Sequence, residues 1–161
     1  MRAIYRHTNI VASDWAVLAE FYEAVFGCEP VPPPRDLSGP WLDEGTGEPG
    51  AHVSGIHLRL PGHGEGGPTL EIYGYATSEP RPAVAANREG IAHIAFEVDD
   101  VAAATRLVLE RGGSRVGDVA SSEVPGVGFL TFAYVADPEG NIIELQSWTA
   151  ANGDATPTRS A

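Results

Sequence analysis

The chain has 161 residues, 43% of them hydrophobic, which is enough for one compact domain or for two half-size modules that share a core. Ten basic residues against 22 acidic ones give a formal net charge of −12 at pH 7, so nucleic acid is excluded as the expected partner. No apolar run approaches the length of a membrane span, and the opening MRAIYRHT lacks the apolar core of a secretion signal. We therefore expect a cytoplasmic protein with no membrane partner.

The first elements predicted along the chain are a strand and a helix. The strand-like run IYRHTNIVASD contains His7 and ends at Asp14, and WAVLAEFYEAVFG then places apolar residues at helical spacing. Ser13 or Asp14 can cap the helix, and Gly27 tolerates the left-handed conformation that ends it. Cys28 follows, and since it has no partner for an intrachain disulfide we expect a small buried hydrophobe. The predictions for this half are a helix over 14–26, strands over 4–11, 28–32, 54–61 and 69–75, and a proline- and glycine-rich loop over 30–50.

The second half repeats this order. GIAHIAFEVDD, residues 90–100, again places a histidine seven positions before an aspartate, and VAAATRLVLERGG follows as the helix. His7 precedes Gly27 by 20 positions, and His93 precedes Gly113 by 20 positions. A shared register of strand, cap, helix and stop indicates two copies of one module. The predictions for this half are a helix over 100–112 and strands over 91–98, 114–119, 128–136 and 141–147.

This element order predicts an α+β fold of two tandem βαβββ modules. We place the first module at residues 1–76, a linker without strand alternation at 77–90, and the second module at 91–148. The small polar residues 149–161 are predicted to form a disordered tail.

Each module closes on a strand that carries a glutamate. In TLEIYGY, residues 69–75, alternation puts Glu71 and Tyr73 on the face opposite the aliphatic side chains. In NIIELQS, residues 141–147, Glu144 likewise lies opposite Ile143 and Leu145, and the preceding DPEG is a turn signal. The repeat therefore supplies one histidine and one glutamate twice.

The paired modules, the DPEGNIIEL ending and the spacing of His7, Glu71, His93 and Glu144 resemble the vicinal oxygen chelate superfamily. That superfamily includes glyoxalase I, methylmalonyl-CoA epimerase, extradiol dioxygenases and the bleomycin and fosfomycin resistance proteins. The resemblance covers about residues 4–148. It implies curled mixed β-sheets that form a cleft, and one metal ligand from each of the four matched positions.

The ligand types fit that expectation. Two imidazoles and two carboxylates suit one divalent ion such as nickel, cobalt, zinc, manganese or iron, with room left for water or substrate. Sulfur is absent from the set, so a structural zinc knot is not expected. Any one of these residues alone is better explained as a half-buried strand histidine or a solvated glutamate. Four at matched module positions favour metal ligation.

Other candidates are weaker. His57 and Arg59 share one face of a predicted strand and either line the substrate pocket or face solvent. Tyr73 is expected to point the same way as Glu71, as a support for the metal ligands or as pocket wall. Trp41, in the predicted loop, either closes over a substrate or anchors its own loop, and His52 and His63 are expected to be solvated loop residues.

The resemblance implies an enzyme that moves a proton next to a carbonyl of a small-molecule substrate, with Glu144 as the base and Glu71 as its partner. The full set of His7, Glu71, His93 and Glu144 is most similar to bacterial glyoxalase I. Epimerases often have glutamine at the position of Glu71. Glyoxalase I, however, has an arginine shortly after its first ligand, whereas HTNIVASD offers none. The substrate stays open among another α-hydroxycarbonyl, a different thiol adduct and an acyl thioester, and the enzyme class between a lyase and an epimerase or isomerase.

Two other classes remain open at this point. An extradiol-type iron(II) dioxygenase would use the positions of His7, His93 and Glu144, and a metal-free small-molecule binding or antibiotic resistance protein would need only the cleft. Members of the family commonly form homodimers, and we expect one here.

Overall fold

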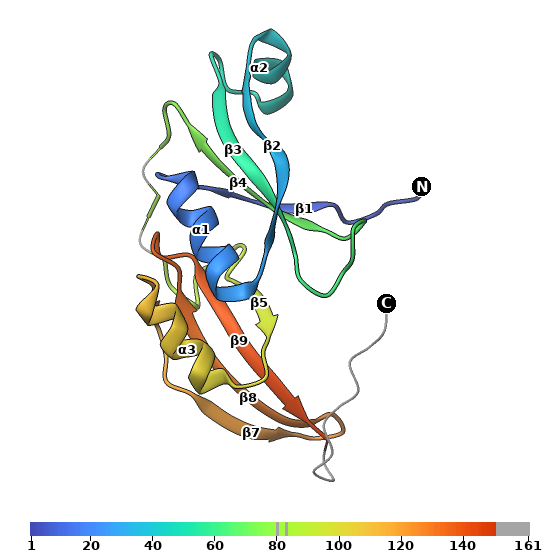
Figure 1. The fold of residues 1–161 in the computed structure, drawn as a ribbon, viewed down its shortest axis with the longest axis vertical. Coiled ribbons are helices and arrows are strands. Elements are labelled where there is room, and N and C mark those ends of the chain that lie inside the picture. The colour runs from blue at the N-terminus through green and yellow to red at the C-terminus, as the bar shows by residue number, and fades with distance from the viewer. Residues whose placement is uncertain (80, 83, 151–161) are drawn as a thin grey trace. The chain divides into compact units, whose positions relative to one another are not determined.

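The computed structural model describes residues 1–79, 81–82 and 84–150. The chain divides into two compact units, residues 1–82 and 83–161. The first unit combines a small mixed sheet with two helices and the second combines one with a single helix, which confirms the α+β fold class (Figure 1). The described part of the chain contains no helix long and apolar enough to cross a membrane.

The N-terminal unit is a four-stranded sheet in the order β1-β4-β3-β2. Its elements are β1 (His7–Val11), α1 (Trp15–Phe26), β2 (Glu29–Ser38), α2 (Pro40–Thr46), β3 (His52–Arg59) and β4 (Thr69–Tyr75). β1 runs parallel to β4, and the other pairs are antiparallel. Helix α1 packs against β3 and β4, so one sheet face is covered and the residues pointing to the other face remain available for a site.

The predicted helix caps are present. Asp14 accepts a hydrogen bond from the Val17 N–H at 3.1 Å, and Gly27 ends α1 with φ of 66°, a conformation that favours glycine. Asp100 caps the second long helix in the same way through the Ala103 N–H at 2.9 Å. The buried face of α1 and the aliphatic faces of β3 and β4 form the core of this unit: Leu18, Phe21, Tyr22, Leu58, Leu70 and Ile72.

The prediction of a loop over residues 30–50 was wrong for residues 30–46. The strand expected over 28–32 continues as β2 to Ser38, and α2 follows it directly. Prolines 32–34 are tolerated because β2 is an edge strand, where missing N–H donors cost little, and the ladder shifts register between Val31 and Arg35. Helix α2 begins with Pro40, which suits a first helical turn, and buries Leu42.

The C-terminal unit repeats this topology with the order β5-β9-β8-β6, and β7 also pairs with β8. Its elements are β5 (Ile94–Glu97), α3 (Val101–Glu110), β6 (Ser114–Arg115), β7 (Ala120–Val124), β8 (Gly128–Ala136) and β9 (Ile142–Thr149). β5 is parallel to β9. Helix α3 packs against β8 and β9.

The strand predicted over 114–119 is interrupted. Only Ser114 and Arg115 pair with β8, after which the Val116 and Gly117 N–H groups both bond to the Tyr134 carbonyl, and β7 then starts at Ala120. Two residues that share one carbonyl form a bulge, which ends the regular ladder. The edge strand that pairs with β3 in one unit, and the edge segment that pairs with β8 in the other, are therefore both interrupted.

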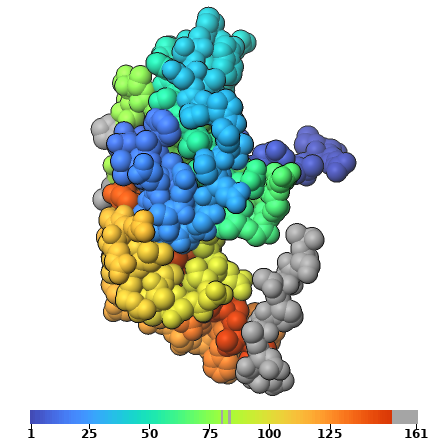
Figure 2. Space-filling model, in the orientation of Figure 1, coloured from blue at the N-terminus to red at the C-terminus, as the bar shows by residue number. Residues whose placement is uncertain are grey.

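The first strand of each unit is shorter than predicted. β4 starts at Thr69, opposite His7, so no β4 residue lies opposite residues 4–6, and the Arg6 carbonyl accepts one bond from the Thr69 N–H at 3.0 Å. These residues stand off the body of the N-terminal unit (Figure 2), where Ile4 and Tyr5 are 63% and 66% exposed. β5 likewise begins at Ile94, so His93 immediately precedes its strand.

The predicted tail boundary at 149 was wrong by at least one residue. Thr149 is still part of β9 and pairs with Phe129. Residues 151–161 of the expected tail lie outside the described residues.

Candidate metal centre

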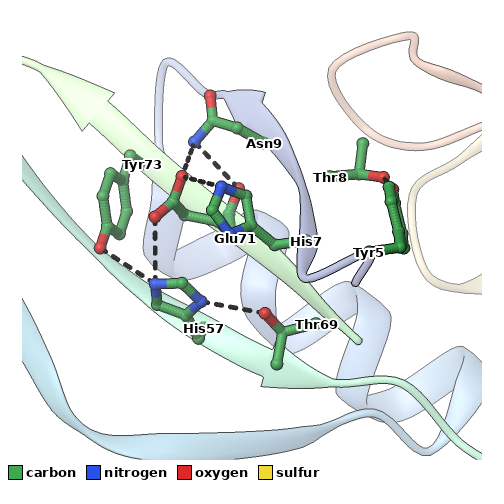
Figure 3. Close-up of polar contacts among 8 residues, drawn as sticks. All are labelled: Tyr5, His7, Thr8, Asn9, His57, Thr69, Glu71 and Tyr73. Atoms are coloured by element: carbon green, nitrogen blue, oxygen red, sulfur yellow. Dashed lines mark hydrogen bonds and ion pairs between the residues drawn. The ribbon is translucent and has the colours of Figure 1, made fainter. Parts of the chain in front are cut away.

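Strand register brings His7, His57 and Glu71 together in the N-terminal unit (Figure 3). Glu71 lies on β4, directly opposite His57 on β3, and His7 on β1 is two residues before Asn9, the partner of Glu71 on that side. The His57 Nε2–Glu71 Oε1 distance is 3.0 Å, and the His7 Nε2–Glu71 Oε2 distance is 3.5 Å. One nitrogen or oxygen from each of the three residues lies within 4.8 Å of the other two.

Asn9 holds the Glu71 carboxylate. Its side-chain Nδ2 donates to Glu71 Oε2 at 2.8 Å and also contacts the Glu71 backbone carbonyl at 3.3 Å. Each carboxylate oxygen of Glu71 therefore has a polar neighbour, Oε1 on the His57 side and Oε2 on the Asn9 and His7 side. This arrangement fixes the direction of Glu71 before any ligand binds.

His57 is held at both ring nitrogens. Nδ1 lies 3.0 Å from the Thr69 hydroxyl oxygen, and Nε2 lies 3.3 Å from the Tyr73 hydroxyl. Burial lowers the pKa of His57 below its usual value, although the Glu71 charge opposes the shift. A neutral ring at neutral pH follows, which is the protonation state that a metal ligand requires.

Tyr73 lines the same cluster. Its ring lies edge-on to His57 with centroids 5.8 Å apart. Burial, with a further contribution from the Glu71 charge, raises the pKa of Tyr73 to about 12. Its hydroxyl therefore stays protonated at neutral pH and can act as a hydrogen-bond donor.

Arg59 does not join this cluster. Its guanidinium pairs with the Glu29 carboxylate at 2.7 Å, at the edge of the sheet. Both residues line a separate cavity of about 410 Å³ beside the loop that contains Pro61 and Gly62. His57 and Arg59 share a strand face as predicted, but only His57 contacts Glu71.

Trp41 lies on α2 and is 60% exposed. Its indole N–H donates to the Ser38 carbonyl at 3.1 Å, a contact within its own segment. Of the two interpretations of Trp41, this contact supports the anchor. His52, expected in a loop, is instead the first residue of β3, and its Nε2 lies 2.5 Å from Asp36 Oδ1.

The C-terminal unit holds the second pair. His93 Nε2 lies 2.9 Å from Glu144 Oε2, and the two side chains are 29% and 15% exposed. The register of β9 places Tyr134 directly opposite Glu144 on β8 and Ala95 opposite it on β5. The His93 and Tyr134 rings have centroids 5.0 Å apart. The two units thus match at the histidine and glutamate positions. At the other two matched positions, the second unit has Tyr134 where the first has His57, and Ala95 where the first has Asn9.

The donor set of the N-terminal cluster fits a divalent metal. Two imidazoles and one carboxylate are the ligands that first-row transition metals accept while keeping open positions. Within the described ranges this is the one group of three or more such residues close enough to share an ion. Sequence reasoning left His57 open between the wall of the substrate pocket and a solvent-facing position. The position of His57 beside Glu71 follows from the register between β3 and β4. The sequence of the hairpin alone does not predict that register.

Comparisons with known proteins agree with this architecture. The family described as "Glyoxalase/Bleomycin resistance protein/Dioxygenase superfamily" matches residues 4–145. The chain belongs to this superfamily. Its members include many enzymes and often bind a metal. No curated protein matches the chain significantly.

Solved structures share the superfamily's fold at low sequence identity. A glyoxalase family protein from Bacillus cereus matches with a TM-score of 0.71 at 18% identity, covering 93% of this chain and 95% of that one. A glyoxalase family protein from Enterococcus faecalis gives a TM-score of 0.55 at 23% identity, with 89% and 97% covered. A glyoxalase/bleomycin resistance protein/dioxygenase family enzyme from Burkholderia phytofirmans gives 0.51 at 16% identity, with 89% and 97% covered. These similarities establish the fold.

Proposed function

We propose that this superfamily member is a metal-dependent enzyme that transfers a proton at the carbon next to a carbonyl of a small-molecule substrate, as a lyase or as an epimerase or isomerase. The observation that carries the proposal is the cluster of His7, His57 and Glu71, together with the repeated pair of His93 and Glu144.

The proposed ligands of one divalent ion are His7, Glu71, His93 and Glu144. The superfamily's use of one residue from each of four strands supports this set. Nickel, cobalt, zinc, manganese and iron all accept such nitrogen and oxygen donors. The ion, when bound, supplies Lewis acidity toward the substrate oxygens.

Glu144 is the proposed base. The polar partner that the structure gives its carboxylate, among the described residues, is His93 at Oε2. Ala95, which stands where Asn9 stands in the other repeat, has no side-chain donor. The second oxygen of Glu144 is therefore free to accept a proton from the substrate carbon.

Glu71 is the proposed partner of Glu144, and its proposed role is mainly to bind the metal. Its two oxygens already face Asn9, His7 and His57. Hydrogen bonds to a carboxylate stabilise the charged form and weaken it as a base. The difference between Asn9 and Ala95 therefore supports different tasks for two glutamates that stand at matched positions.

The test compares Glu144→Gln with Glu71→Gln in heavy water. Metal-loaded protein is incubated with α-hydroxyketones, hemithioacetals and 2-methyl-branched acyl thioesters, and exchange of the proton next to the carbonyl is followed by NMR. Glu144→Gln should slow exchange by about 10² to 10⁴ while it keeps metal, because glutamine retains an oxygen but cannot accept the proton. Glu71→Gln should slow exchange less.

Glu97→Gln is the matched control, since Glu97 is an exposed glutamate of the same sheet. It should leave exchange unchanged. If wild-type protein exchanges none of these substrates but consumes oxygen with catechols, the chemistry is that of a dioxygenase. If Glu71→Gln abolishes exchange and Glu144→Gln spares it, the two glutamates have the opposite roles.

A further inference from the structure

We infer that Arg35 holds a negatively charged oxygen group of the substrate, a carboxylate or a phosphate, on the sheet face that carries His57 and Glu71. This inference rests on the proposed function and narrows its substrate class from small carbonyl compounds in general to anionic ones. It makes Arg35 a residue that determines which substrate is bound, and it leaves the proposed metal ligands unchanged.

Strand register places Arg35 on the same sheet face as the candidate metal centre. Arg35 on β2 lies opposite Gly55 on β3, and Gly55 lies opposite Tyr73 on β4. Paired residues on antiparallel strands point to the same face, and alternate residues of one strand share a face, so Arg35, Tyr73 and Glu71 point the same way. A Cβ at Gly55 would collide with the Tyr73 ring, which shows that the ring lies against the Gly55 backbone. Arg35 and Tyr73 therefore lie in one row across the sheet, with no side chain at the position between them.

The row of Arg35 lies between an apolar and a polar part of this face. On one side Leu37, two residues further along β2, packs against the hydrophobic cluster that contains Leu42 of α2. On the other side, one row away, lie His57 and Glu71. Strand spacing and rise put the Cα atoms of Arg35 and Glu71 about 12 Å apart. The long arginine side chain spans part of that distance, so one small substrate can contact both residues.

The Arg35 guanidinium has no carboxylate partner among the described residues. Arg35 is half-buried, and the hydrogen bond that the structure gives its side chain runs from Nη1 to the Val31 carbonyl at 3.3 Å. A guanidinium carries five N–H donors, so most of them remain available. Arg59, on the neighbouring strand, is by contrast paired with Glu29 at 2.7 Å. A half-buried charge that lacks an acidic partner, in a chain with 22 acidic residues, indicates a ligand of opposite charge.

The positive charge of Arg35 acts on the residues around Glu71. Burial lowers the pKa of His57 against the opposing Glu71 charge, and the Arg35 charge adds to the lowering. Burial raises the pKa of Tyr73 to about 12, and the Arg35 charge opposes that shift. The guanidinium is therefore close enough to both side chains to interact with them. The Tyr73 hydroxyl points toward His57 on β3 and stays protonated at neutral pH, so it is a second donor for an anionic group held by Arg35 (Figure 3).

The experiment compares three synthetic probes on zinc-loaded, full-length protein by isothermal titration calorimetry. Each probe has the same hydroxamate, which chelates a divalent ion through two neighbouring oxygens, and the same short carbon chain. The chains end in a carboxylate, a phosphonate or a neutral carboxamide. Wild type should bind at least one anionic probe about tenfold or more tightly than the carboxamide, because a hydrogen-bonded ionic contact contributes at least that much. The anionic probe with the larger gain identifies the group as a carboxylate or a phosphate.

Variants of Arg35 separate anion binding from a structural role. Arg35→Gln should lose the preference for the anionic probes and bind the carboxamide as wild type does. Arg35→Lys should keep part of the preference, since it keeps the charge but loses the planar fork. Arg115→Gln is the matched control, because it removes an equal charge from an arginine that pairs with Asp118 in the other unit, and it should keep the full preference. If Arg35→Gln does not fold, Arg35→Met, which keeps the apolar stem of the side chain, takes its place.

The results that overturn the inference differ from those that overturn the proposed function. An Arg35→Gln variant that keeps the preference, or that binds all three probes more weakly by the same factor, overturns the inference, as does a wild type without any preference. If wild type takes up no metal, the proposed function fails. In that case, or if none of the probes binds, metal-free protein is titrated with succinate and with inorganic phosphate. A saturable shift of the Arg35 Nε–H signal in NMR then supports the inference, and an unchanged signal overturns it.

Discussion

Replacing Asn9 with alanine tests how Glu71 is held. Asn9 donates to Glu71 Oε2 at 2.8 Å, and a hydrogen bond to a charged group contributes about 1.5–3 kcal/mol. Asn9 is exposed, so water replaces part of the lost interaction, and we expect the low end or less, about 1.4 kcal/mol. This corresponds to about a tenfold loss of metal affinity.

The assay measures the affinity of the protein for Co²⁺ or Zn²⁺ in competition with a chromophoric chelator, with folding checked by circular dichroism. Asn87→Ala, which removes an exposed asparagine from the linker, is the control and should bind metal normally. The reverse change, Ala95→Asn, adds a donor opposite Glu144 and should slow proton exchange, because a hydrogen bond to the carboxylate weakens it as a base. An Asn9→Ala variant with wild-type affinity would refute the argument that Asn9 positions Glu71.

Four other predictions concern the scaffold and the oligomeric state. Burial, and then the Glu23 charge, raises the pKa of the Cys28 thiol to about 12, so the folded protein should not react with Ellman's reagent at pH 8, whereas unfolded protein should. The unfolded thiol ionises near 9.0 and releases its proton first, so Cys28 should lower stability as pH rises above that value, an effect that Cys28→Ala removes. Gly55→Ala should destabilise the protein by about 1–3 kcal/mol in urea unfolding, because the new Cβ would lie 2.1 Å from the Ile72 carbonyl oxygen; Gly45→Ala, with open space around it, should not. We also expect a homodimer by light scattering, and a monomer at all concentrations would contradict that expectation.

Much of the fold follows from local sequence signals. Asp14, Gly27 and Asp100 mark helix ends, and the alternation in TLEIYGY gives both the limits of β4 and the side on which Glu71 lies. These features depend on neighbours a few residues away, so the sequence alone predicts them. Strand ends at His7 and His93 were less accurate because they depend on where the partner strand begins.

The parts that were missed depend on pairing between distant segments. A run of three prolines predicts a loop, but the same run is compatible with a strand at the edge of a sheet, and only the sheet order shows that β2 is at the edge. β7 was missed because ASSEV is polar and exposed, so its pairing with β8 leaves no hydrophobic alternation. His57 was recognised as a candidate but not as a neighbour of Glu71, since that contact depends on the register across a long hairpin loop.

The proposed metal dependence is tested by the metal content of the full-length chain, purified gently without chelators and measured by mass spectrometry. We predict about one divalent ion per chain, and a fall in melting temperature after chelation, because a ligand bound only by the folded state stabilises it. Protein that contains no metal, and whose melting temperature does not rise with added nickel, cobalt, zinc, manganese or iron(II), would contradict it.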